Sequence, residues 1–158
     1  MRALVGTALL IIAAASLAPL ASAKPTNTAA TEFVRRHHLG SNLKTMAFAT
    51  AQKTQTFGML ASEMGTLEAR RVVSKELDKH AHQFQGKWDT NLAKAYAQNF
   101  TPEELASLAS EGRNSRYVRK LSEKQNAVGE SMQRVSKPIL TEYVTTAMTS
   151  AFFKMPPR

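Results

Sequence analysis

The chain has 158 residues, no cysteine, and 21 lysine and arginine residues against 12 aspartate and glutamate residues, a net charge of +9. The absence of cysteine excludes disulfides, thiol nucleophiles and thiolate zinc sites, and it also excludes a lipid anchor of the bacterial lipoprotein type. The positive charge favours anionic partners such as lipid head groups or acidic proteins. The length fits one domain.

The first 23 residues have the features of a secretory signal peptide. Arg2 supplies a positive start, residues 3–18 are almost entirely apolar, and residues 21–23 (ASA) have the small-x-small pattern of a cleavage site. The apolar run is slightly shorter than the ~20 residues of a membrane-spanning helix. The sequence therefore predicts cleavage after Ala23, a mature chain from Lys24 without a transmembrane segment, and export to the periplasm or the medium.

Two helices are expected in the first part of the mature chain. Asn27 or Thr28 can cap a helix that runs to residue 39, where Gly40 would adopt the left-handed conformation that often ends a helix. Ser41 can cap a second helix, whose apolar residues recur at helical spacing as far as Gly65.

A long third helix is expected from Thr66. Its apolar residues follow one another at steps of three or four, which keeps one face inward for more than five turns. Gly86 lies within this stripe and could mark a bend, although the unbroken stripe favours a continuous helix. The stripe consists of Val73, Leu77, Ala81, Phe84, Trp88, Leu92 and Ala95.

The strongest local signal is a helix start at residues 101–104. Thr101 is a good N-cap, Pro102 occupies the first helical position, where a missing N–H costs nothing, and Glu104 can complete a capping box. The helix that begins here is short and ends near Gly112.

Two more helices complete the expected fold. One begins near Asn114, and Pro138 is expected to kink or break it before a final apolar stripe that reaches residue 152. No alternating strand pattern and no internal repeat stands out. The sequence therefore predicts an all-α, single-domain bundle of five or six helices over residues 24–158.

Residues 96–105 (YAQNFTPEEL) resemble the hallmark of a group of small exported bacterial proteins, catalogued as domain of unknown function 2059. The resemblance covers about residues 67–152: a long helix, the hallmark, and two further helices. Members of that family continue with an aromatic pair and a Ser-Pro-x-Gly turn, whereas this chain has EGRNSRY at 111–117. The resemblance implies a helical fold and an exported location, and it brings no catalytic residue.

Neither the histidines nor the acidic residues form a recognisable catalytic or metal-binding pattern. His37 and His38 are adjacent, and His80 and His82 are two residues apart, so neither pair has the i, i+4 spacing of a helical zinc site. The adjacent acids at 103 and 104 are explained by helix capping. We therefore expect no metal, no cofactor and no enzymatic activity.

A basic segment is the candidate binding site. Arg116, Lys120 and Lys124 have the i, i+4, i+8 spacing of one helical face, and Tyr117 lies beside it. Arg113 and Arg119 belong to the same segment, which could hold a phosphate-bearing lipid or an acidic protein. The alternative is a face that is merely solvated.

The leading functional hypothesis is a non-enzymatic exported protein that binds a protein partner or an anionic component of the cell envelope. The alternatives are a small hydrolase acting on envelope polymers or lipids, and an exported immunity or inhibitor protein. Nucleic acid is not an expected partner, because the protein is expected outside the cytoplasm.

Overall fold

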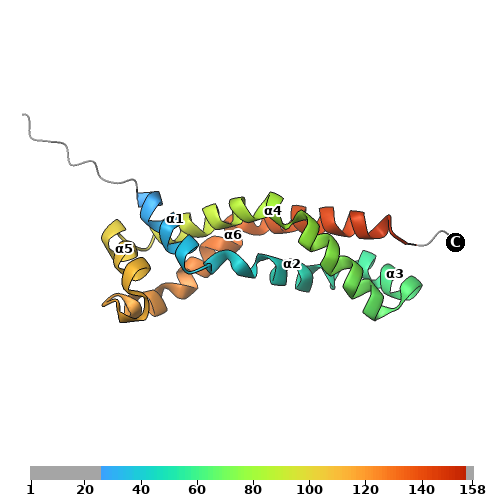
Figure 1. Cartoon of the computed structure of the whole chain (residues 1–158), viewed down its shortest axis with the longest axis horizontal. Helices are drawn as coiled ribbons and strands as arrows, with labels where there is room; N and C mark the ends of the chain where they lie inside the picture. Colours follow the sequence, from blue (N-terminus) through green and yellow to red (C-terminus); the bar gives the residue numbers. More distant parts are fainter. Residues whose placement is uncertain (1–25, 156–158) are drawn as a thin grey trace, which may run out of the picture.

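The computed structural model describes residues 26–155, which form six α-helices and two short 3-10 helices, with no strand in this range (Figure 1). The elements are α1 (Thr26–Arg36), η1 (Leu39–Asn42), α2 (Leu43–Ala51), α3 (Gln55–Met64), α4 (Thr66–Ala97), α5 (Pro102–Glu111), η2 (Gly112–Asn114) and α6 (Val118–Phe152). The all-α fold class is thereby confirmed. The expected signal peptide and its cleavage before Lys24 lie outside the described residues.

Two long helices form the axis of the molecule. α4 runs from the end occupied by α3 to the end occupied by α5, and α6 returns alongside it in the opposite direction (Figure 1). With 32 and 35 residues, they are about 50 Å long at 1.5 Å per residue. α1 packs against α4 and α5, while α2 and α3 each contact both long helices.

The apolar stripe of α4 forms the centre of the core. Six of its seven predicted residues are buried, and Ala81 is partly buried against them. α4 is continuous through Gly86, which lies on its exposed side. A stripe that is buried along its whole length stabilises the helix enough to tolerate one glycine, which costs about 1 kcal/mol.

The expected single helix from Ser41 to Gly65 is wrong. α2 ends at Ala51, and α3 begins after Thr54, whose hydroxyl accepts a hydrogen bond of 3.2 Å from Phe57 N and donates one of 2.7 Å to the Ala51 carbonyl. This threonine therefore ends one helix and caps the next, a role that its position within an apolar helical pattern concealed.

The role expected of Gly40 is also wrong. The left-handed residue after α1 is His38, with φ of 50°, while Gly40 is buried beneath α4. A Cβ atom on Gly40 would lie 1.8 Å from Asp89 Oδ1, and its carbonyl accepts a 2.9 Å hydrogen bond from Gln85 Nε2. Glycine is needed here for close approach to α4.

The expected helix start near Asn114 is wrong, because α6 begins only at Val118. Pro138 does not end a helix either, because α6 is continuous through it to Phe152. Pro138 is exposed, and so is Arg134, whose carbonyl loses its N–H partner to the proline. Buried residues on either side, such as Met132 and Tyr143, pack the helix into the core. This packing outweighs the local effect of the proline.

Candidate functional site

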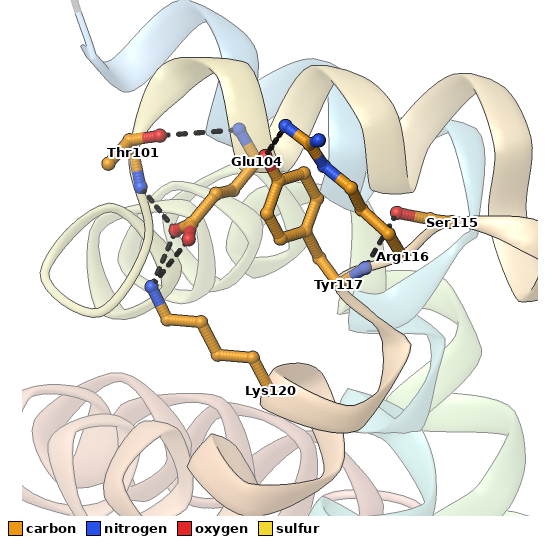
Figure 2. A network of polar contacts seen from close by, with 6 residues as sticks. All are labelled: Thr101, Glu104, Ser115, Arg116, Tyr117 and Lys120. Atoms are coloured by element: carbon orange, nitrogen blue, oxygen red, sulfur yellow. Dashed lines mark hydrogen bonds and ion pairs between the residues drawn. The ribbon is translucent and has the colours of Figure 1, made fainter.

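Part of the predicted basic segment stabilises a helix cap. Thr101 Oγ1 accepts a 3.3 Å hydrogen bond from Glu104 N, and Glu104 Oε2 accepts one of 2.9 Å from Thr101 N, so the capping box is confirmed with Pro102 at the first helical position. Lys120 Nζ then donates to both carboxylate oxygens of Glu104, at 2.8 and 2.6 Å (Figure 2). These hydrogen bonds lower the pKa of Glu104, against the opposing effect of partial burial.

Lys120 is consequently held in place by the protein itself. Its ammonium lies 5.1 Å from the centre of the Phe100 ring, and its side chain is 35% exposed. The lysine therefore joins the beginning of α6 to the beginning of α5. A cation paired in this way has little capacity left for an external anion.

Arg116 does not share a helical face with Lys120, because it precedes α6. Its guanidinium donates a 2.5 Å hydrogen bond to Tyr117 Oη and lies 4.8 Å from the centre of the same ring. Figure 2 shows the Arg116 and Lys120 side chains pointing to different partners. The predicted i, i+4, i+8 face is therefore wrong, since the chain forms a turn at residues 115–117 that spacing alone did not reveal.

The other basic residues of the segment are exposed. Arg119 pairs with Glu123 at 3.5 Å one helical turn away, while Arg113 and Lys124 form no ion pair within residues 26–155. Exposed charges of this kind contribute little individually. The structure thus brings Arg116 and Tyr117 together and pairs Lys120 with Glu104, while Arg113 and Lys124 are exposed without an ion pair in the described part of the chain.

The histidines are distributed over separate parts of the molecule. His37 Nε2 donates a 3.0 Å hydrogen bond to the Leu108 carbonyl, which joins α1 to α5, and His80 Nε2 lies 3.0 Å from Ser150 Oγ on α6. His38 and His82 are exposed. No three histidine, aspartate or glutamate side chains within residues 26–155 gather in a metal-binding arrangement.

A groove of about 860 Å³ lies between α2, α4 and α6. Each helix contributes residues one turn apart, so the groove follows the helix axes. Its lining combines large apolar side chains with uncharged polar ones and one lysine: Leu39, Asn42, Met46, Thr50, Trp88, Leu92, Tyr96, Gln125, Val128, Gly129, Met132, Gln133, Ser136, Lys137, Leu140 and Thr141.

The polar groups in the walls are largely paired within the protein. Trp88 Nε1 donates to Asn42 Oδ1 at 3.3 Å, and Ser136 Oγ accepts from Asn91 at 3.2 Å. Burial raises the pKa of Tyr96. A hydrogen bond between its hydroxyl and Gln125 lowers this pKa, but less than burial raises it. The apolar surface is left without a partner, as shown by Met46, which is 41% exposed.

The spacing of residues in the sequence does not reveal this groove. Trp88 and Leu92 were expected in the α4 core stripe, where they are indeed buried, and nothing in their spacing indicated that they also border a hollow. The available signal was Gly129, a glycine inside an expected helix, where it costs stability relative to alanine and leaves the helix surface without a side chain. The break between α2 and α3 was also missed.

The capping box supports a direct test. Thr101→Ala is expected to destabilise the protein by about 1 kcal/mol, because the N–H of Glu104 loses its acceptor, while Thr101→Ser should cost only a few tenths. Denaturant unfolding followed by circular dichroism measures both. Equal stability of the alanine variant and the wild type would show that the cap contributes nothing.

Within residues 26–155, no helix combines the length and apolarity of a membrane-spanning segment. Comparison with known protein families, curated proteins and solved structures gives no match to this chain. The functional assignment therefore depends on the geometry of the groove and of its rim.

Proposed function

We propose that this chain is a non-enzymatic exported binding protein that holds a long alkyl chain in the groove between α2, α4 and α6. The observation that carries the proposal is the groove's apolar lining, contributed by three different helices. Its volume of about 860 Å³ lies within the range of about 300–1,000 Å³ typical of small-molecule sites. Burial of each methylene group contributes about 0.8 kcal/mol, so an alkyl chain gains affinity over its length.

The groove is long. Along α6 its lining extends from Gln125 to Thr141, which is about 24 Å at 1.5 Å per residue. An alkyl chain that lies along the helix axes can bury methylene groups over this length. An amphipathic helix of a protein partner is the alternative occupant of such a groove, and the ligand tests below distinguish the two.

The alternative functions have less support. A hydrolase needs a nucleophile with a base, or paired carboxylates, facing a cleft, and the groove lining that residues 26–155 provide includes no aspartate, glutamate or histidine. An immunity or inhibitor protein acting through the basic segment would rely on Lys120, which is paired with Glu104. The resemblance of residues 96–105 to the exported family stays a prediction, on which the proposal does not depend.

Export is the part of the proposal that rests on residues 1–23. Their positive start, apolar run and cleavage pattern are typical of a secretory signal. Intact-mass measurement of protein from the exported fraction should give a chain that begins at Lys24. Recovery of the full-length chain in the membrane fraction would contradict this part.

The groove itself is tested by filling it. Gly129 lines the groove, and a Cβ atom at this position meets no atom within 4 Å. Gly129→Leu should therefore fold normally, gain helix propensity and occupy space that the ligand needs. Displacing two methylene groups, at about 0.8 kcal/mol each, corresponds to a loss of affinity of slightly more than tenfold.

The uncharged dye phenylnaphthylamine serves as the probe, and Trp88, the only tryptophan of the chain, reports binding through its fluorescence. Gly86→Leu is the matched control, because Gly86 is also an exposed helical glycine without neighbours within 4 Å but does not line the groove. We expect the dye to bind the wild type and Gly86→Leu equally and Gly129→Leu weakly. Equal affinity for all three proteins would overturn the proposal.

A further inference from the structure

We infer that the groove selects an alkyl chain with an anionic end, and that its ligand is a long-chain carboxylate of the fatty-acid class. This inference rests on the proposed function and adds the chemistry of the head group. Lys137 is the one charged residue among the described residues that line the groove. Within the described part of the chain, no acidic side chain lines the groove to repel an anion or neutralise the lysine.

Lys137 is free to bind an anion. It is exposed and forms no ion pair within residues 26–155. The lysines at 44, 120 and 154, in contrast, are paired with Asp78, Glu104 and Glu76. The flexible stem of a lysine can lie along an apolar surface while its ammonium stays in water, which suits a site at the rim of an apolar groove.

Uncharged hydrogen-bond donors flank this lysine along the same wall. Gln133 precedes it by one helical turn and Thr141 follows it by one turn, and both line the groove. An amide, an ammonium and a hydroxyl thus follow one another along the rim over about 12 Å. A carboxylate can accept hydrogen bonds from the Lys137 ammonium and from the neighbouring amide or hydroxyl, and it carries the single charge that one lysine balances.

The test measures displacement of phenylnaphthylamine at pH 8 by dodecanoate and by dodecanol, which share an alkyl chain and differ in charge, and by dodecyl phosphate, which carries a different anionic group. Lys137→Glu should weaken displacement by dodecanoate about fivefold, the factor for one exposed ion pair, and leave displacement by dodecanol unchanged. The difference in dodecanoate affinity between the wild type and Lys137→Glu should diminish as the salt concentration rises, because exposed charges are screened. The control variant is Lys124→Glu, which makes the same change in net charge at an unpaired, exposed lysine of α6 outside the groove. It should alter displacement by neither dodecanoate nor dodecanol.

The two ligands separate failure of this inference from failure of the proposed function. If dodecanol displaces the dye and Lys137→Glu leaves dodecanoate unaffected, the anionic selectivity is refuted while the groove still binds an alkyl chain. If neither ligand displaces the dye, the alkyl-chain function itself is refuted. This is the result expected of a groove that binds the helix of a partner protein. If dodecyl phosphate displaces the dye at lower concentration than dodecanoate and loses more affinity in Lys137→Glu, the carboxylate assignment is overturned in favour of a phosphate.

Discussion

Leu77→Ala is expected to destabilise the protein by about 2–5 kcal/mol, because it removes a fully buried side chain and leaves a cavity. Leu77 is 0% exposed in the middle of α4. Its carbonyl accepts a 2.7 Å hydrogen bond from Tyr143 Oη of α6, so the two long helices meet tightly at this point. The surrounding helices have little freedom to close a cavity there.

Leu67→Ala is the control for this prediction. Leu67 belongs to the same helix but is 83% exposed, so its replacement should change stability by no more than about 0.5 kcal/mol. Denaturant unfolding followed by circular dichroism compares the two variants. A similar loss at both positions would mean that α4 is not packed through its predicted stripe.

Lys154→Met is expected to destabilise the protein at pH 7 and to reverse part of its pH dependence. Glu76 is 1% exposed on α4, and its Oε1 accepts a hydrogen bond from Lys154 Nζ near the end of α6. The other oxygen, Oε2, has no hydrogen-bond partner within residues 26–155. Without Lys154 a buried carboxylate loses its main partner, which costs about 1–3 kcal/mol.

The sign of the pH effect follows from the pKa of Glu76. The hydrogen bond from Lys154 lowers this pKa from its ordinary value of 4.5, while burial acts in the opposite direction. A carboxyl with a lowered pKa in the folded state stabilises the fold above its unfolded pKa, and this contribution is lost as the pH falls through the folded pKa. The wild type should therefore lose stability from Glu76 as the pH falls below about 4.5.

In Lys154→Met, burial becomes the largest influence on Glu76, opposed only by the weaker effects of Lys79 and His80. The pKa of Glu76 should then rise above its ordinary value, and protonation should stabilise the variant as the pH falls from 7 towards 5. Denaturant unfolding of both proteins between pH 4 and 7 measures this. An unchanged pH profile in Lys154→Met would contradict the prediction, and the Glu76→Gln/Lys154→Met double variant should lose the effect.

The sequence by itself determined the features that depend on neighbouring residues. The capping box needs only Thr101 and Glu104 three residues apart, with Pro102 at the first helical position, and the α4 stripe needs only a step of three or four between apolar residues. Both follow from helix geometry, which is local. The helical fold class could be predicted for the same reason.

Only the tertiary structure decided which of these residues remain available for a ligand. Lys120 is paired because α5 and α6 begin beside one another, and Pro138 lies within a helix because packing against α4 outweighs its local effect. The groove forms where η1 and α2 come together with α4 and α6, which are far from them in the chain, and line a common hollow. These features depend on contacts between residues far apart in the chain, whose energies no local spacing reveals.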